Sequence, residues 1–203
     1  MGFGLLFIGY LFMYSFPYLG FDVVPDIIGF VISYIGIKSL SEYGCGWDTL
    51  KKYFSILLPS GLLTLIFQAI GLFGVKHFVV DLWFYIYSAL LLIYNVLLLM
   101  AIYKIAVDTD SHSIKAKAQR NLFLGIVYYI IMLFLNCPIP VIQKLNVYLS
   151  THYTAGFILY IFGYIWQFLN LALIFSCYMW ICTEEDKEMP IKNKKLFKKK
   201  DEE

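Results

Sequence analysis

The stretch LWFYIYSALLLIYNVLLLMAIY, residues 82–103, decides the fold class. It contains no Lys, Arg, Asp or Glu, and its only side-chain amide is that of Asn95. A helix of about 20 mostly apolar residues is long enough to cross a hydrocarbon core of roughly 30 Å. This stretch therefore predicts a transmembrane helix, and the rest of the chain can be compared with it.

The whole chain has the composition of a membrane protein. Of its 203 residues, 61% are hydrophobic and only 15% are charged, whereas soluble domains are roughly 45–50% apolar and about 25% charged. The apolar residues come in long blocks, so the sequence predicts an all-α polytopic protein with a bundle of about six transmembrane helices. The predicted spans are residues 3–21, 23–40, 53–75, 82–103, 122–142 and 157–182.

The distribution of positive charge predicts the orientation, because cytoplasmic loops carry the excess of Lys and Arg. With six spans, of the 16 Lys and Arg residues only Lys76 and Lys144 fall on the side opposite the termini. We therefore expect a cell-membrane protein with cytoplasmic N- and C-termini. Residues 1–182 form the single transmembrane domain, and residues 183–203 form a charged tail with too little apolar content to fold alone.

Polar residues inside the predicted spans recur on single helix faces. In the predicted span 53–75 the stripe consists of Ser60, Thr64, Gln68 and Gly71. In the span 157–182 it consists of Gly163, Gln167, Asn170 and Cys177, and in the span 82–103 Ser88 and Asn95 share one face. Such residues pack helices together and form hydrogen bonds between them. The alternative is a polar pathway for a solute, for which the candidate residues are Gln68, Asn95, Gln167 and Asn170.

A second candidate group lies on the predicted outer face, where FDVVPDIIGF, residues 21–30, connects the first two spans. Pro25 suits the first turn of a helix, and Asp26 would meet the positive end of the helix dipole there. The motif thus predicts a turn and a helix start. The alternative is a cation or proton site that includes Asp26, and the candidate residues of this outer group are Asp22, Asp26, His77 and Asp81.

The sequence contains no known catalytic signature and no metal-ligand or phosphate-binding motif. We expect no enzyme activity, no cofactor, no metal and no nucleic-acid partner. The lysines of the tail are either solvated or in contact with anionic lipid. The function hypotheses are transport of a small solute or ion, and a non-catalytic regulatory or assembly module that contacts membrane or cytoplasmic protein subunits.

The segments GFGLLFIGYLF, residues 2–12, and FDVVPDIIGFVISYIGIKSLSEY, residues 21–43, carry a resemblance. They resemble the N-terminal hairpin of small polytopic membrane proteins of low-GC Gram-positive bacteria, a group without an established activity. The resemblance implies a bacterial membrane protein, in agreement with the preference for Lys over Arg, and it assigns no functional residues.

Overall fold

The structure is a computed structural model that describes residues 2–13, 17–18, 21–22, 26–44, 46–72, 78–135, 137, 142, 147 and 153–181. Within these residues the fold is helical, apart from two short strands and one 3₁₀ turn. The helices are α1 (Gly2–Phe12), α2 (Asp26–Leu40), α3 (Trp47–Leu72), α4 (Phe78–Asp108), α5 (His112–Leu135) and α7 (Tyr153–Ile181); the other elements are β1 (Pro17–Tyr18), β2 (Phe21–Asp22) and η1 (Ser41–Tyr43).

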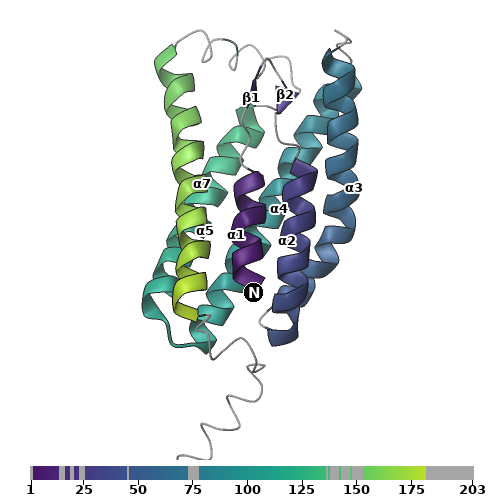
Figure 1. The fold of residues 1–203 in the computed structure, drawn as a ribbon. Coiled ribbons are helices and arrows are strands. Elements are labelled where there is room, and N and C mark those ends of the chain that lie inside the picture. Colours follow the sequence, from purple (N-terminus) through teal and green to yellow (C-terminus); the bar gives the residue numbers. More distant parts are fainter. Residues whose placement is uncertain are drawn as a thin grey trace, which may run out of the picture.

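The helices form a closed ring (Figure 1). Each helix packs against the next one along the chain, and α7 returns to pack against α1. Successive helices run in opposite directions, so Gly2 and Ile181 lie at the same end of the bundle. Short connections favour such antiparallel neighbours, because a few residues can only join helix ends that lie close together.

The first helix is much shorter than the predicted span 3–21, so a single continuous helix over that range is not found, while the crossing itself stays a prediction. α1 ends at Phe12, and β1 and β2 pair in an antiparallel register that places Pro17 opposite Asp22. Pro17 and Tyr18 lie in a strand and not in a helix, and proline, which lacks an amide hydrogen, is favoured outside helix interiors. With 11 residues, α1 is about 16 Å long, roughly half of a hydrocarbon core.

The segment between the predicted spans 82–103 and 122–142 is mostly helical. α5 begins at His112, and only residues 109–111 separate it from α4. Asp110 adopts a φ of 52°, and the amide of Ser111 donates to the carbonyl of Ala106 at 2.9 Å, which ends α4 with a left-handed residue. Lys, Ala, Gln and Arg are strong helix formers, so polarity alone does not predict a loop.

Four helices contain segments long and apolar enough to cross a membrane, namely Trp47–Ile70, Phe78–Asp108, His112–Leu135 and Phe157–Ile181. They lie in α3, α4, α5 and α7. The structure therefore agrees with a membrane protein, while the crossing of α1 and α2 stays a prediction.

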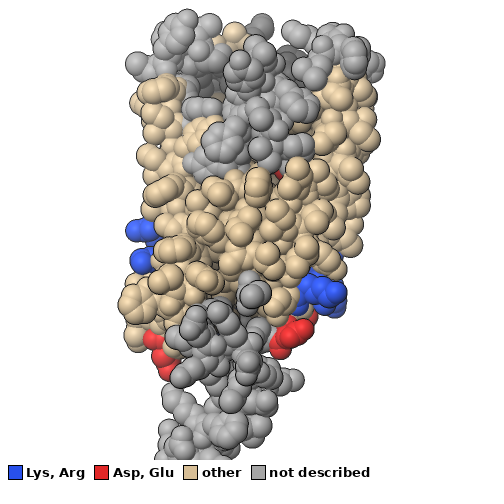
Figure 2. All heavy atoms as spheres, viewed as in Figure 1, with Lys and Arg blue, Asp and Glu red and all other residues tan. Residues whose placement is uncertain are grey.

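Apolar side chains cover the outside of the bundle as well as its interior. Large exposed examples on α3, α5 and α7 include Ile56, Leu62, Phe123, Ile130, Phe168 and Met179, while Phe54, Tyr94 and Trp166 are buried inside. A helix that is apolar all round is typical either of a large protein core or of a membrane span. On the face drawn in Figure 2, the described residues across the middle of the bundle are almost all uncharged.

The described basic residues gather at the end of the bundle that contains Gly2 and Ile181 (Figure 2). They lie at the end of α2, the start of α3, the end of α4 and the start of α5, and they are Lys38, Lys51, Lys52, Lys104, Lys115, Lys117 and Arg120. Lys76, Lys144 and the tail from residue 183 onward lie outside the described residues.

Candidate functional site

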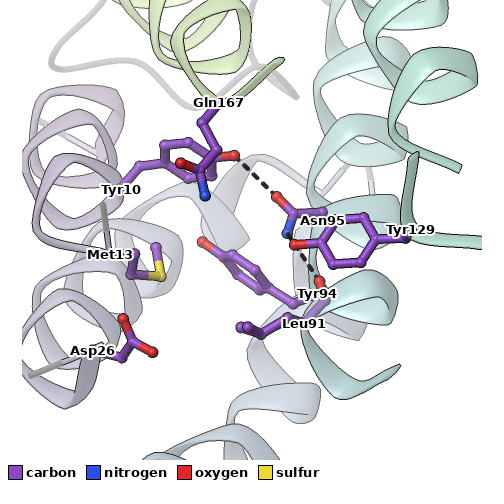
Figure 3. Close-up of a pocket in the computed structure, with 8 residues that line it drawn as sticks. All are labelled: Tyr10, Met13, Asp26, Leu91, Tyr94, Asn95, Tyr129 and Gln167. Carbon is purple, nitrogen blue, oxygen red and sulfur yellow. Dashed lines mark hydrogen bonds between the residues drawn. The ribbon is translucent and has the colours of Figure 1, made fainter. Parts of the chain in front are cut away.

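A polar cavity of about 60 Å³ lies inside the helix ring. Five helices surround it, because its lining comes from α1, α2, α4, α5 and α7, together with the residue that follows α1. The lining residues are Tyr10, Met13, Asp26, Leu91, Tyr94, Asn95, Tyr129 and Gln167 (Figure 3).

The cavity lies where the two short helices end. Tyr10 belongs to the last turn of α1, and the amide of Met13 closes that turn by donating to the carbonyl of Gly9 at 3.1 Å. Asp26 is the first residue of α2, as the sequence predicted for a helix start. Figure 1 shows that these two helix ends stop short of the end of the bundle that carries β1 and β2.

A chain of hydrogen bonds runs along one wall of the cavity and connects four helices. The Tyr10 hydroxyl on α1 donates to Asn95 Oδ1 on α4 at 3.1 Å, and it accepts from Asn170 Nδ2 on α7 at 3.0 Å. Asn121 Nδ2 on α5 donates to Asn170 Oδ1 at 3.1 Å. All four side chains are buried. Buried polar groups need such partners, since leaving one unpaired costs about 1–3 kcal/mol.

Asn95 and Asp26 form additional hydrogen bonds beside this chain. Asn95 Nδ2 donates to the carbonyl of Leu91 at 2.9 Å and to the Tyr129 hydroxyl at 3.3 Å. The half-buried Asp26 accepts from the Tyr87 hydroxyl at 2.6 Å, a separation typical of a hydroxyl bound to a charged carboxylate. Asp26 is thus held in place by a second helix, α4.

Tyr94 differs from these residues, because its hydroxyl has no hydrogen-bond partner among the described residues. The side chain is only 1% exposed. Figure 3 shows Asp26 and Met13 on one side of the cavity, Asn95 and Tyr129 on the other, and the Tyr94 hydroxyl pointing into the space between them. The cavity therefore presents one unused donor and acceptor.

The structure brings together most of the residues predicted for the polar pathway. Asn95 and Gln167 line the cavity, and Asn170 is one hydrogen bond away from it through Tyr10. Gln68 is half-buried on α3, a helix that contributes no residue to the lining.

The predicted outer-face group is described only in part. Asp26 lies at the cavity, as given above. Asp22 lies in β2 and Asp81 in α4, but their side chains are outside the described part of the structure, as is all of His77. Whether these three residues form a group with Asp26 stays a prediction.

Sequence reasoning missed the tyrosines. Tyr10, Tyr94 and Tyr129 line the cavity, and Tyr87 binds Asp26. In a chain with 17 tyrosines, a single one carries little information, because tyrosine is common at membrane interfaces. The available signal was the spacing of seven between Tyr87 and Tyr94, which places both on one helix face.

Among the described residues, no three His, Cys, Asp or Glu side chains come together as a metal site would require. The cavity instead combines one carboxylate with phenol, amide and thioether groups. Such a set can bind a small polar or positively charged solute, and it contains no nucleophile paired with a general base. Comparisons with protein-family models, curated proteins and solved structures find no match to this chain.

Proposed function

We propose that the protein is a membrane transport component for a small solute or ion, and that the cavity is the solute site. The observation that carries this proposal is a polar cavity with a carboxylate, enclosed by a ring of helices whose outer surface is apolar. Ionisable residues at membrane depth are costly, and where they occur they usually mark a path for a substrate or ion.

The two short helices support the proposal. Transporters commonly form their sites where a helix is interrupted near the middle of the membrane, because the free backbone groups and helix dipoles act on the substrate there. α1 ends and α2 begins at the cavity. In the proposed arrangement, α1, the β1/β2 segment and α2 together make the first two of six crossings, with both termini in the cytoplasm.

A non-catalytic regulatory or assembly module is the second candidate. One observation favours it: the bonds among Tyr10, Asn95, Asn170 and Asn121 connect four helices in the way that packing alone would require. In this case the cavity would be a packing defect and would bind no solute.

Flux through reconstituted vesicles separates the two candidates. Purified protein in proteoliposomes would be screened for uptake of inorganic ions, amines, amino acids and small neutral solutes, starting with any solute that mass spectrometry finds in the purified sample. We expect Gln167→Leu to reduce uptake at least tenfold, because it replaces a polar lining group by an apolar one. Gln68→Leu, the same change at a half-buried position on α3, is the matched control.

Two results would contradict transport. One is uptake that does not exceed that of protein-free vesicles for any solute in the screen. The other is equal uptake by the Gln167 and Gln68 variants, which would mean that the cavity lies off the path.

A further inference from the structure

The charge of the cavity points to the class of its ligand. Among the described lining residues, Asp26 is the one group with a charge at neutral pH, since the others are neutral phenols, amides, a leucine and a methionine. No Lys, Arg or His is among them. A solute that enters this space meets one negative charge, so a positive charge on the solute is favoured and a second negative charge is opposed.

Two contacts favour the charged form of that carboxylate. As the first residue of α2, Asp26 lies at the positive end of a helix dipole. It also accepts from the Tyr87 hydroxyl at 2.6 Å, and such a bond favours the carboxylate over the neutral acid. Both contacts stabilise a negative charge at this position.

The remaining ligands are oxygen atoms. The Tyr94 hydroxyl is buried without a partner among the described residues and points into the cavity (Figure 3). Its lone pairs are available to a metal ion or to an N–H donor. The amide of Gln167 from α7 adds a carbonyl oxygen to the lining.

The size and the charge of the cavity limit the class of ligand further. A cavity of about 60 Å³ has room for a few water-sized groups, since about 10–15 Å³ of such volume is enough to hold one water molecule. Ca²⁺ takes six to eight oxygens, commonly from several carboxylates, whereas the described residues of the lining supply one carboxylate.

We infer that the cavity binds one small monovalent cation, either an alkali-metal ion or a protonated amine of a few heavy atoms, with Asp26 as its counter-charge and the Tyr94 hydroxyl as a ligand. This inference rests on the proposed function, in that it names the substrate class of the same site.

Thermal unfolding of the detergent-purified protein tests the inference. The baseline buffer contains N-methylglucamine chloride, whose cation is too large for the cavity. Sodium, potassium and methylammonium chloride replace it at constant ionic strength. We expect at least one of them to raise the unfolding midpoint saturably by several degrees. An alkali-metal site responds to sodium or potassium alone, and an amine site responds to methylammonium.

Two variants and two matched controls connect the effect to the site. Asp26→Asn should abolish the shift, and Tyr94→Phe, which removes a single oxygen, should weaken cation binding at least tenfold. Asp48→Asn changes an exposed acid in the first turn of α3, and Tyr34→Phe changes a half-buried tyrosine of α2 that packs against Phe54. Both controls should keep the wild-type shift. If Asp26→Asn does not fold, Tyr94→Phe alone decides.

The inference is overturned if no small cation shifts the midpoint relative to N-methylglucamine, or if the shift survives in Asp26→Asn or, undiminished, in Tyr94→Phe. Its failure is distinguishable from that of the transport proposal. Uptake of a neutral solute that depends on Gln167, without any cation effect on stability, would remove the cation inference alone. Binding that depends on Asp26, without any uptake, would keep the cation inference and remove the transport proposal.

Discussion

At the scale of single residues, the interior depends on a few amides that each serve two helices. Asn170 is the central one, because it donates to Tyr10 on α1 and accepts from Asn121 on α5. Its side chain is 1% exposed, so water cannot replace these partners easily. Hydrogen bonds between helices in membrane proteins contribute about 0.6 kcal/mol on average, and more is lost where a buried partner stays unpaired.

Asn170→Ala should therefore lower the free energy of unfolding by about 1–3 kcal/mol, since it removes both bonds and leaves Tyr10 and Asn121 with fewer partners. Denaturant or thermal unfolding in detergent measures the effect. Gln68→Ala, at a half-buried amide outside the network, should change stability by less than about 0.5 kcal/mol. Equal losses in the two variants would mean that the network contributes little to stability.

At the scale of elements, glycines allow α1 and α2 to pack with their backbones in contact. A Cβ atom placed on Gly36 would lie 2.7 Å from the carbonyl oxygen of Gly2 and 2.9 Å from the amide nitrogen of Leu6. A Cβ atom on Gly29 would lie 2.7 Å from the carbonyl oxygen of Gly9. Small residues at helix interfaces permit such close approach. This contact positions the ends of two short helices at the cavity.

Gly36→Ala should separate α1 from α2, because the added methyl group meets backbone atoms that cannot rotate away. Overpacking of this kind costs typically about 1–3 kcal/mol, which the unfolding midpoint would report. Gly4→Ala is the matched control on α1, since its Cβ atom would lie at an ordinary 3.5 Å from the ring of Tyr178 on α7. A Gly36 variant as stable as the Gly4 variant would show that the helix contact is looser than the structure indicates.

At the scale of the whole molecule, the alternation of helix direction and the position of charge agree with each other. The helices of the ring alternate in direction, so the start of α1 and the end of α7 lie at the same end of the bundle (Figure 1). The described Lys and Arg residues gather on that same side (Figure 2). Cytoplasmic segments carry the excess of positive charge, so this side is the cytoplasmic one in the proposed orientation.

Reporter fusions test this orientation in cells. Fusions at residue 112, where α5 begins, and at residue 203 should give cytoplasmic signals: fluorescence from a green fluorescent protein and no activity from a periplasmic phosphatase. An extracytoplasmic signal from either fusion would contradict the proposed orientation.

The sequence by itself determined the helical class and four long apolar helices, because hydropathy is a sum over neighbouring residues. It also predicted Asn95, Gln167 and Asn170 as candidates, since a polar residue inside an apolar helix is visible locally. The sequence predicted the ends of the helices less well. Apolar composition does not reveal that α1 ends at Phe12, well inside the predicted span 3–21. Nor does it reveal that α5 begins ten residues before the predicted span 122–142, because polar residues also form helices.

Only the tertiary structure decided which polar groups meet. Tyr10 and Asn170 are 160 positions apart and become partners because α7 closes the ring against α1. Gln68 follows the same spacing rule on its helix as Gln167, yet α3 supplies nothing to the cavity. The sequence predicts Asp26 as part of a helix start. It becomes part of the site because α1 ends close to it. Such contacts depend on which face of each helix turns inward. The helical period shows which residues share a face, but it does not show which other helix that face contacts.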